Sequence, residues 1–428
     1  MTLRTIAWLV LSSIYTVTAA AAASTISSPF TLVDNRVFLP AFVNGKGPYS
    51  FLLDTGVDTW AVATSLAHRL AIPQGKAERI TGAGEARDTL HELQLRRVDL
   101  AGLSFTDQPA LSADFSGLDA VIGFQHFDGI AGKPVFEAYV VDLDFARARA
   151  RFFSPAQYSA PAGAKVMPFE LFETIPVVRG EIAGIKGRFL VDLGDRSSLT
   201  LFGPFWRAHH LDRVFGPGVV AITGYGLGGP VKGEVVRVPE FTMSGVRVRG
   251  IVARLSLQKA GAFNTSAIAG SIGTGILKRF NVTFDYRKRR ILLQEAPGRD
   301  VPDEADRSGL WLGRSGSDFE VFGVVPNSPA ARGGIKERGH RNRDQWRADR
   351  AIGSFRHTRG VEVTWKEGLC VHPQGWEPFQ SRDGRVARPH SEELNWSAGL
   401  ESACSEVIFA CNDCQAAEVA LKSPRSSP

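Results

Sequence analysis

Two short stretches of the sequence place an aspartate in a glycine turn directly after an apolar run. Residues 51–56 read Phe-Leu-Leu-Asp-Thr-Gly, and residues 189–194 read Phe-Leu-Val-Asp-Leu-Gly. Two carboxylates within hydrogen-bond reach cannot both ionise cheaply, so they share one proton. One then acts as a base toward water, and the other acts as an acid toward a carbonyl group. The repeated turn therefore predicts acid–base hydrolysis by Asp54 and Asp192, with no cofactor and no metal.

Three neighbouring residues are expected to support the pair. Gly56 and Gly194 let the backbone come close and donate N–H groups to the carboxylates. The Thr55 hydroxyl can tie one turn to the other. Leu193 occupies the position in the second turn that Thr55 occupies in the first, so the second turn lacks a matching hydroxyl, and losing one such hydrogen bond costs about 1 kcal/mol. A lone Asp-Thr-Gly is most often an ordinary turn, so it is the duplication that favours catalysis.

Residues 51–72 resemble the active-site segment of the retropepsin-like aspartic proteases. A second family element, an apolar-apolar-glycine run with a short helix and a strand, occurs twice in the same order. It lies at residues 119–127 and 139–144, and again at 270–280 and 282–286. The resemblance covers about residues 30–296. It implies a mostly β protein with two retropepsin-like closed β lobes, the acid protease fold, and both aspartates on one chain.

The resemblance also implies residues that hold a peptide substrate. Asp58 and Asp195 follow the two turns, where family members hold the substrate backbone. Gly82 and Gly84 lie at a hairpin tip where the family carries its mobile flap. Tyr225 lies in the corresponding second flap and is placed to cover the substrate. An ordinary hairpin and a surface tyrosine explain these last three residues equally well.

The N-terminus has the pattern of a secretory signal. Residues 1–23 combine one positive charge, a short apolar core and a run of small residues, which predicts a signal peptide and a periplasmic or secreted protein. Ser12, Ser13 and Thr16 interrupt the apolar core, which is shorter than the about 20 residues of a membrane helix. We expect no integral membrane segment in the protein after the signal peptide is removed.

Composition agrees with a globular exported protein. Hydrophobic residues make up 44% of the chain, and the net charge is +6 over 428 residues. The sequence contains no stripe of Lys and Arg interleaved with aromatic residues, which is the pattern typical of nucleic-acid binding. Adjacent histidines such as His209 and His210 cannot chelate one ion as an i,i+4 pair does, so they do not indicate a metal site. We expect a monomer that acts on peptides or proteins.

The chain divides into five parts. They are a signal peptide (1–23), lobe 1 (27–155), lobe 2 (165–296), a partial PDZ-like domain (306–336) and a tail (337–428). Residues 319–336 resemble the first half of a bacterial PDZ domain, but the continuation from Glu337 lacks the family's Gly-Asp and Asn-Gly elements. With codons chosen freely for residues 337–349, reading one base later permits both elements, so our hypothesis is a truncated or frameshifted PDZ domain followed by a non-native or disordered tail.

Between the first turn and the first flap, residues 61–70 have apolar residues at helical spacing, which predicts a helix. Taken together, the sequence predicts an exported aspartic endopeptidase. The alternative is a catalytically impaired pseudoprotease that binds extended peptides by strand addition or acts as a scaffold.

Overall fold

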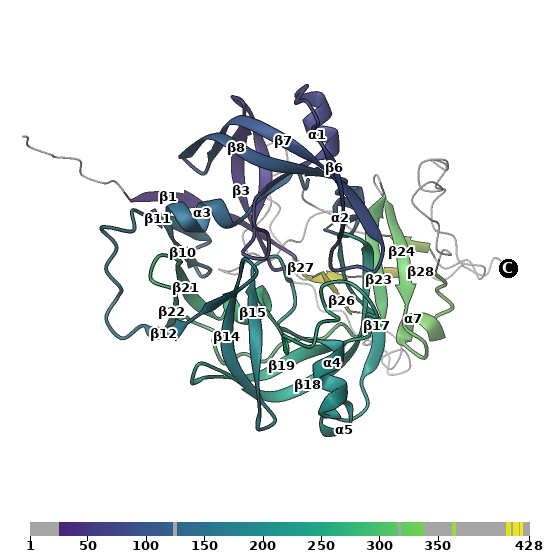
Figure 1. The fold of residues 1–428 in the computed structure, drawn as a ribbon. Coiled ribbons are helices and arrows are strands. Elements are labelled where there is room, and N and C mark those ends of the chain that lie inside the picture. Colours follow the sequence, from purple (N-terminus) through teal and green to yellow (C-terminus); the bar gives the residue numbers. More distant parts are fainter. Residues whose placement is uncertain are drawn as a thin grey trace, which may run out of the picture.

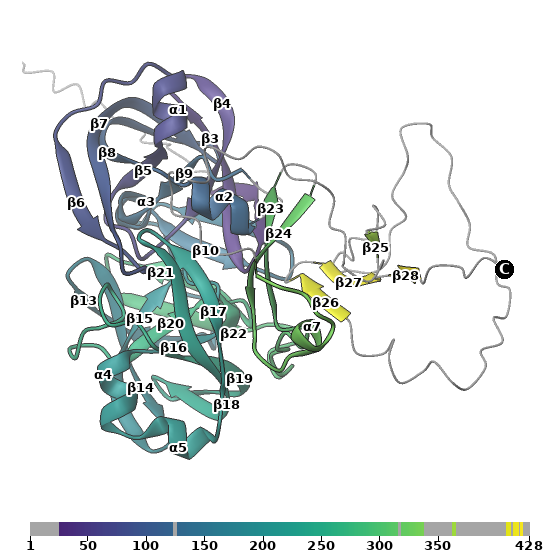
Figure 2. The same ribbon diagram turned by 90° about the vertical axis from the view of Figure 1, so that its right-hand side faces the viewer.

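The structure is a computed structural model that describes residues 25–122, 126–315 and 318–337, with four short strands further along the chain. Most of it consists of two large sheets, one above the other in Figure 2, with a smaller sheet joining them. The fold is mostly β, which confirms the predicted fold class.

The first large sheet forms lobe 1. Its strands are β2 (Thr31–Val33), β3 (Arg36–Val43), β4 (Lys46–Leu53), β5 (Trp60–Ala63), β6 (Ala77–Thr81), β7 (Arg87–Leu100), β8 (Leu103–Ala113) and β9 (Gly129–Ala131). They lie in the order β2-β3-β4-β9-β5-β8-β7-β6, and β3 also pairs with β7, which curls the sheet. The helices are α1 (Thr64–Arg69), α2 (Ser116–Ile122) and α3 (Lys133–Ala138).

The second large sheet forms lobe 2 and repeats this design. Its strands are β13 (Glu170–Phe172), β14 (Ile175–Ile182), β15 (Ile185–Asp192), β16 (Leu199–Leu201), β17 (Val219–Gly226), β18 (Gly229–Met243), β19 (Val246–Ser256) and β20 (Gly270–Gly273). The order β13-β14-β15-β20-β16-β19-β18-β17 matches the first sheet strand for strand, and β14 pairs with β18 as β3 does with β7. The helices are α4 (Gly203–Ala208), α5 (Leu211–Phe215) and α6 (Thr274–Leu277).

A six-stranded sheet takes strands from both halves. Its strands are β1 (Ile26–Pro29), β10 (Val140–Asp144), β11 (Arg149–Phe153), β12 (Lys165–Pro168), β21 (Phe280–Asp285) and β22 (Arg290–Glu295), in the order β1-β11-β10-β21-β22-β12. The halves meet at β10 and β21, which pair antiparallel. The sheet therefore fixes the two lobes relative to each other (Figure 1).

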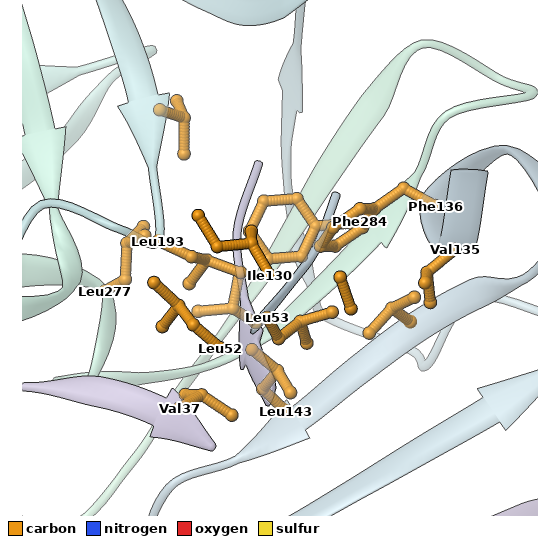
Figure 3. Close-up of a cluster of buried hydrophobic side chains, with 14 of the residues drawn as sticks. Val37, Leu52, Leu53, Ile130, Val135, Phe136, Leu143, Leu193, Leu277 and Phe284 are labelled. Carbon is orange, nitrogen blue, oxygen red and sulfur yellow. The ribbon is translucent and has the colours of Figure 1, made fainter. Parts of the chain in front are cut away.

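The apolar core continues across this junction. Figure 3 shows Leu53 and Ile130 of lobe 1 close to Leu193 and Leu277 of lobe 2. All four belong to one buried cluster, and Leu53, Leu193 and Leu277 are fully buried. Strands β5 and β20 are buried at every position, because each lies between two neighbouring strands. Of these two strands, β20 pairs directly with β15, the strand that ends in Asp192.

After lobe 2 the chain forms a small hairpin and a helical turn. These are β23 (Leu310–Ser315), β24 (Asp318–Val324) and α7 (Pro329–Arg332). Ser328 caps α7, since its hydroxyl accepts a hydrogen bond from the Ala331 N–H at 3.2 Å. The hairpin lies beside α2 and β17 (Figure 2). Assignment of residues 306–336 to the PDZ family stays a prediction.

The predictions for the two ends fall largely outside the described residues. The signal peptide at 1–23 lies there entirely, and so does most of the tail at 337–428. The described parts of the tail are β25 (Glu362–Thr364), β26 (Ile408–Cys411), β27 (Cys414–Glu418) and β28 (Ala420–Lys422). In the part of the chain that the structure covers, no helix combines the length and apolar character needed to cross a bilayer.

The prediction of a helix at residues 61–70 was wrong for its first turn. Residues Trp60–Ala63 form β5, which pairs parallel with β8 and antiparallel with β9, and the helix α1 begins only at Thr64. A short apolar run has no periodicity that distinguishes a buried strand from a buried helix. The pairing available in the centre of the sheet decides the outcome here.

Candidate active site

The two aspartates lie at equivalent places in the two lobes. Asp54 directly follows β4, and Asp192 is the last residue of β15. Each strand pairs parallel with a short buried neighbour, β9 in lobe 1 and β20 in lobe 2. The Asp54 N–H also donates to the Ala131 carbonyl at 3.0 Å. Apolar strands thus deliver both carboxylates to the junction of the lobes, where the Gly194 N–H donates to both of them.

Backbone N–H groups surround the pair. Asp54 Oδ1 accepts from the Gly56 N–H at 2.7 Å and from the Gly194 N–H of the other lobe at 3.1 Å. Asp192 Oδ1 accepts from the Gly194 N–H at 2.8 Å and from the Asp195 N–H at 3.2 Å. Four donations to two oxygens orient both carboxyl groups and stabilise negative charge on them.

Gly56 and Gly194 are needed for this close approach. A Cβ atom on Gly194 would lie 2.4 Å from Asp54 Oδ2, and one on Gly56 would lie 2.8 Å from Asp192 Oδ1. No side chain fits at such distances without displacing a carboxylate. The structure therefore places both predicted glycines against the aspartate of the opposite lobe.

The Thr55 hydroxyl connects the two turns by hydrogen bonds, whereas the Leu193 side chain has no hydroxyl to form a second bridge. The Thr55 hydroxyl donates to the Val191 carbonyl at 2.8 Å and accepts from the Leu193 N–H at 3.0 Å. Leu193 itself is fully buried among apolar side chains of both lobes (Figure 3). Its carbonyl accepts from the Thr274 hydroxyl at 3.1 Å. Apolar packing thus takes the place of the second hydroxyl bridge.

The environment separates the acidities of the two carboxyl groups. Burial raises the pKa of Asp54 above its ordinary value, although the hydrogen bonds from Gly56 and Gly194 oppose this. Burial and the nearby charges of Asp54 and Asp195 raise the pKa of Asp192 much further. Because the two carboxyl groups interact, they titrate as a pair, and both shifts favour a pair that keeps a proton where two isolated carboxyl groups would release it.

The two acids predicted to hold substrate lie in very different surroundings. Asp58 is exposed to solvent after the first turn. Asp195 is buried; its Oδ1 accepts from the Ser197 hydroxyl at 2.6 Å, and its Oδ2 accepts from the Thr200 hydroxyl at 2.9 Å. It also forms a buried ion pair with Arg254. Burial raises the pKa of Asp195, but the charge of Arg254 and these hydrogen bonds bring it below its ordinary value.

The two predicted flaps touch each other at their tips. The Gly84 N–H donates to the Leu227 carbonyl at 2.8 Å, and the Ala86 N–H donates to the Gly228 carbonyl at 3.1 Å. A Cβ on Gly84 would lie 2.1 Å from the Gly228 carbonyl carbon, and one on Gly82 would lie 2.6 Å from Leu227 Cβ. Both glycines therefore permit the contact between the β6–β7 hairpin and the β17–β18 hairpin.

Tyr225 lies on the second flap and packs against lobe 1. A Cβ on Gly117 of α2 would lie 2.6 Å from the Tyr225 hydroxyl oxygen, so the ring fills the space above that glycine. This contact places Tyr225 between the flap and α2.

Sequence reasoning missed the basic residues that support the site. Arg254 donates to the Thr223 carbonyl at 2.8 Å in addition to its pairing with Asp195. Arg36 donates to the Gly194 carbonyl at 3.2 Å. Both arginines occur next to long apolar runs of β19 and β3. A lone charge in such a run was the available signal, because a buried cation needs a specific partner.

In the described residues, no group of three or more His, Cys, Asp or Glu side chains has the arrangement of a metal site. His126, His209 and His210 are exposed.

Residues 39–126 match a family model described as aspartyl protease. A search of curated proteins found no match to the chain. The matched segment contains Asp54, Thr55, Gly56 and the first flap, so the comparison supports a relationship to the aspartyl proteases for the part of the chain that holds the first aspartate.

Proposed function

We propose that this protein is an exported aspartic endopeptidase in which Asp54 and Asp192 activate water. The observation that supports the proposal most directly is the buried, hydrogen-bonded carboxyl pair, which receives backbone N–H groups from both turns. Such a pair holds one proton and can work as base and acid in a single step.

In the proposed reaction, ionised Asp54 takes a proton from a water molecule while the oxygen of that water adds to the peptide carbonyl carbon. Protonated Asp192 donates its proton to the carbonyl oxygen, which gives a tetrahedral diol. Transfer of a proton from Asp54 to the amide nitrogen and return of a diol proton to Asp192 break the C–N bond. After the carboxylic acid and amine products dissociate, the dyad again holds one shared proton.

Substrate binding is proposed to use the flaps and Asp58. The hairpin tips at Gly82, Gly84 and Leu227 close over the junction of the lobes, so a peptide enters after they separate. Asp58 is exposed close to the first turn and is free to accept backbone N–H groups of an extended peptide. Replacing Asp58 by Asn is expected to raise KM about tenfold with a smaller change in kcat, because it weakens binding outside the bond that breaks.

A second candidate is a pseudoprotease that only binds peptides. It is favoured by one observation, the burial of Leu193 among apolar side chains, which leaves the dyad with a single hydroxyl bridge. Both candidates predict peptide binding, and only the first predicts cleavage.

The discriminating experiment is digestion of a mixed peptide library by the protein lacking residues 1–23, followed by mass spectrometry. The Asp54→Asn and Asp192→Asn variants are run in parallel, with Asp107→Asn as a control remote from the dyad. Cleavage that either dyad substitution abolishes supports the peptidase. Peptide binding without cleavage by the unmodified protein supports the pseudoprotease.

Export is proposed from the signal-like residues 1–23. Expression of the full chain in a bacterium with a periplasm tests it, since N-terminal sequencing of the periplasmic fraction should find a mature chain that begins near residue 24. A full-length chain confined to the cytoplasm would contradict export.

A further inference from the structure

The turn between β2 and β3 of lobe 1 reaches the second catalytic turn. Asp34 and Asn35 form this turn with φ values of 50° and 56°. Two consecutive residues with positive φ are typical of tight hairpin turns, whose shape is set by the paired strands. Arg36, the next residue, begins β3. The backbone conformation of the three consecutive polar residues 34–36 is therefore set by the turn and by the start of β3.

These residues contact lobe 2 on both sides of Asp195. The Arg36 Nε donates to the Gly194 carbonyl at 3.2 Å, and the Asn35 Nδ2 donates to the Arg196 carbonyl at 2.8 Å. Asp34 forms ion pairs with Arg36 and with Arg196. The segment 34–36 therefore binds both the backbone and a side chain of the turn that carries Asp192.

Arg36 is the most enclosed member of this group, with 6% of its side chain exposed. A buried guanidinium is stable only where its charge and N–H groups are paired. Its two described partners are Asp34 and the Gly194 carbonyl, so its position depends on the second turn, and the position of the second turn depends on it. The same peptide unit is functionally central, because the Gly194 N–H donates to both Asp54 and Asp192.

We propose that Arg36 is a positioning residue for the dyad. It holds Gly194 from the opposite lobe and so fixes the N–H that Gly194 offers to both carboxyl groups. It supplies a side-chain link between the lobes at the turn where Leu193 offers no hydroxyl. The inference rests on the proposed peptidase function and names a residue that acts through Gly194 and does not touch substrate.

Arg279 provides a matched control for the test. Its side chain is 5% exposed, it pairs with Asp303, and its Nη1 donates to the Arg249 carbonyl at 2.8 Å. It thus has the same kinds of partner as Arg36, but neither Asp303 nor Arg249 belongs to a turn that carries Asp54 or Asp192. Arg36→Met and Arg279→Met should lower the melting temperature by similar amounts, so stability alone does not separate them.

The experiment measures kcat and KM for both variants at a temperature where each is folded. Arg36→Met is expected to lower kcat about tenfold and leave KM within about twofold, because a small displacement of a catalytic group slows the chemical step. Arg279→Met is expected to keep both constants. Equal kinetic effects of the two substitutions would overturn the proposal.

Hydrogen–deuterium exchange provides a readout that needs no activity. Arg36→Met is expected to speed exchange in peptides covering residues 189–198, where the Gly194 N–H lies, and Arg279→Met is not. Unchanged exchange in this segment would overturn the positioning role. If Arg36→Met speeds exchange in this segment but the unmodified protein cleaves no peptide, the contact between Arg36 and Gly194 is supported and the peptidase function is rejected.

Discussion

Thr55 makes the two hydroxyl contacts that join the turns of Asp54 and Asp192, and its replacement tests that link. Thr55→Val keeps the shape and removes both bonds, so we expect a loss of about 1–3 kcal/mol in unfolding free energy. The same change should lower kcat by about tenfold or more. Thr55→Ser should restore most of both. Thr59→Val, which removes an exposed hydroxyl contact to Pro109, is the control for denaturant melts and kinetics.

Asp192 should make the stability of the protein depend on pH. Its pKa is raised well above the ordinary value of 3.8 by burial and by neighbouring acids, so the folded state binds a proton that the unfolded state releases. Stability contributed by this group is therefore present below pH 3.8 and is lost as pH rises toward its pKa in the folded protein.

Asp192→Asn removes that titration. The melting temperature of the variant, measured relative to that of the original protein, should increase as the pH rises from about 3.8. Each 1 kcal/mol of stability corresponds to a shift of about 1–2 °C for a folded body of about 300 residues. Calorimetry between pH 3 and pH 8 measures the difference, with exposed Asp58→Asn as the control. A difference that stays constant across this range would contradict a shared proton on Asp192.

At the scale of elements, the two flap hairpins form one closed unit. Gly84→Ala would place a methyl group 2.1 Å from the Gly228 carbonyl carbon, so the tips cannot keep their present contact. If the hairpins act as the proposed flaps, kcat/KM should fall about tenfold, because flap closure would act on bound substrate. The melting temperature should change little, because the hairpin tips contribute little to the core. Gly333→Ala, whose new methyl would lie 3.3 Å from its nearest neighbour, is the control.

The sequence predicted the strands that carry the aspartates better than it predicted their surroundings. Apolar runs ending in an Asp-x-Gly turn are local patterns, and both are found at the ends of β4 and β15. The partners of Asp195 are 2–59 residues away, and Arg36 lies 158 residues from Gly194. Such contacts depend on how the sheets close, which no local spacing encodes. The strand β5 was missed for the same reason.

At the scale of the whole molecule, the lobes share an interior and a six-stranded sheet. The hairpin β23–β24 is attached to this body, where Trp311 lies against the Arg196 guanidinium at 5.4 Å from the ring centre. Arg196 also pairs with Asp34 of lobe 1. The segment up to Glu337 therefore belongs to the structure that holds the second turn.

The remaining tail is predicted to contribute neither stability nor activity. A chain that ends at Glu337 should keep the melting temperature of the full chain within about 1 °C, which corresponds to less than about 1 kcal/mol. Its kcat/KM should also be unchanged. A chain ending at Ala296, which lacks Trp311 as well, is the comparison and should melt earlier. A large loss on removing only residues 338–428 would contradict the predicted non-native tail.

The pH dependence of kcat/KM, measured on one cleaved peptide, tests the central claim most directly. The account predicts a bell-shaped profile, because ionised Asp54 and protonated Asp192 are both required, and a loss of about 10²–10⁴-fold on replacing either by Asn. A loss of less than about tenfold on either substitution, or a kcat/KM that does not fall on both sides of an optimum pH, would contradict a catalytic pair formed by Asp54 and Asp192.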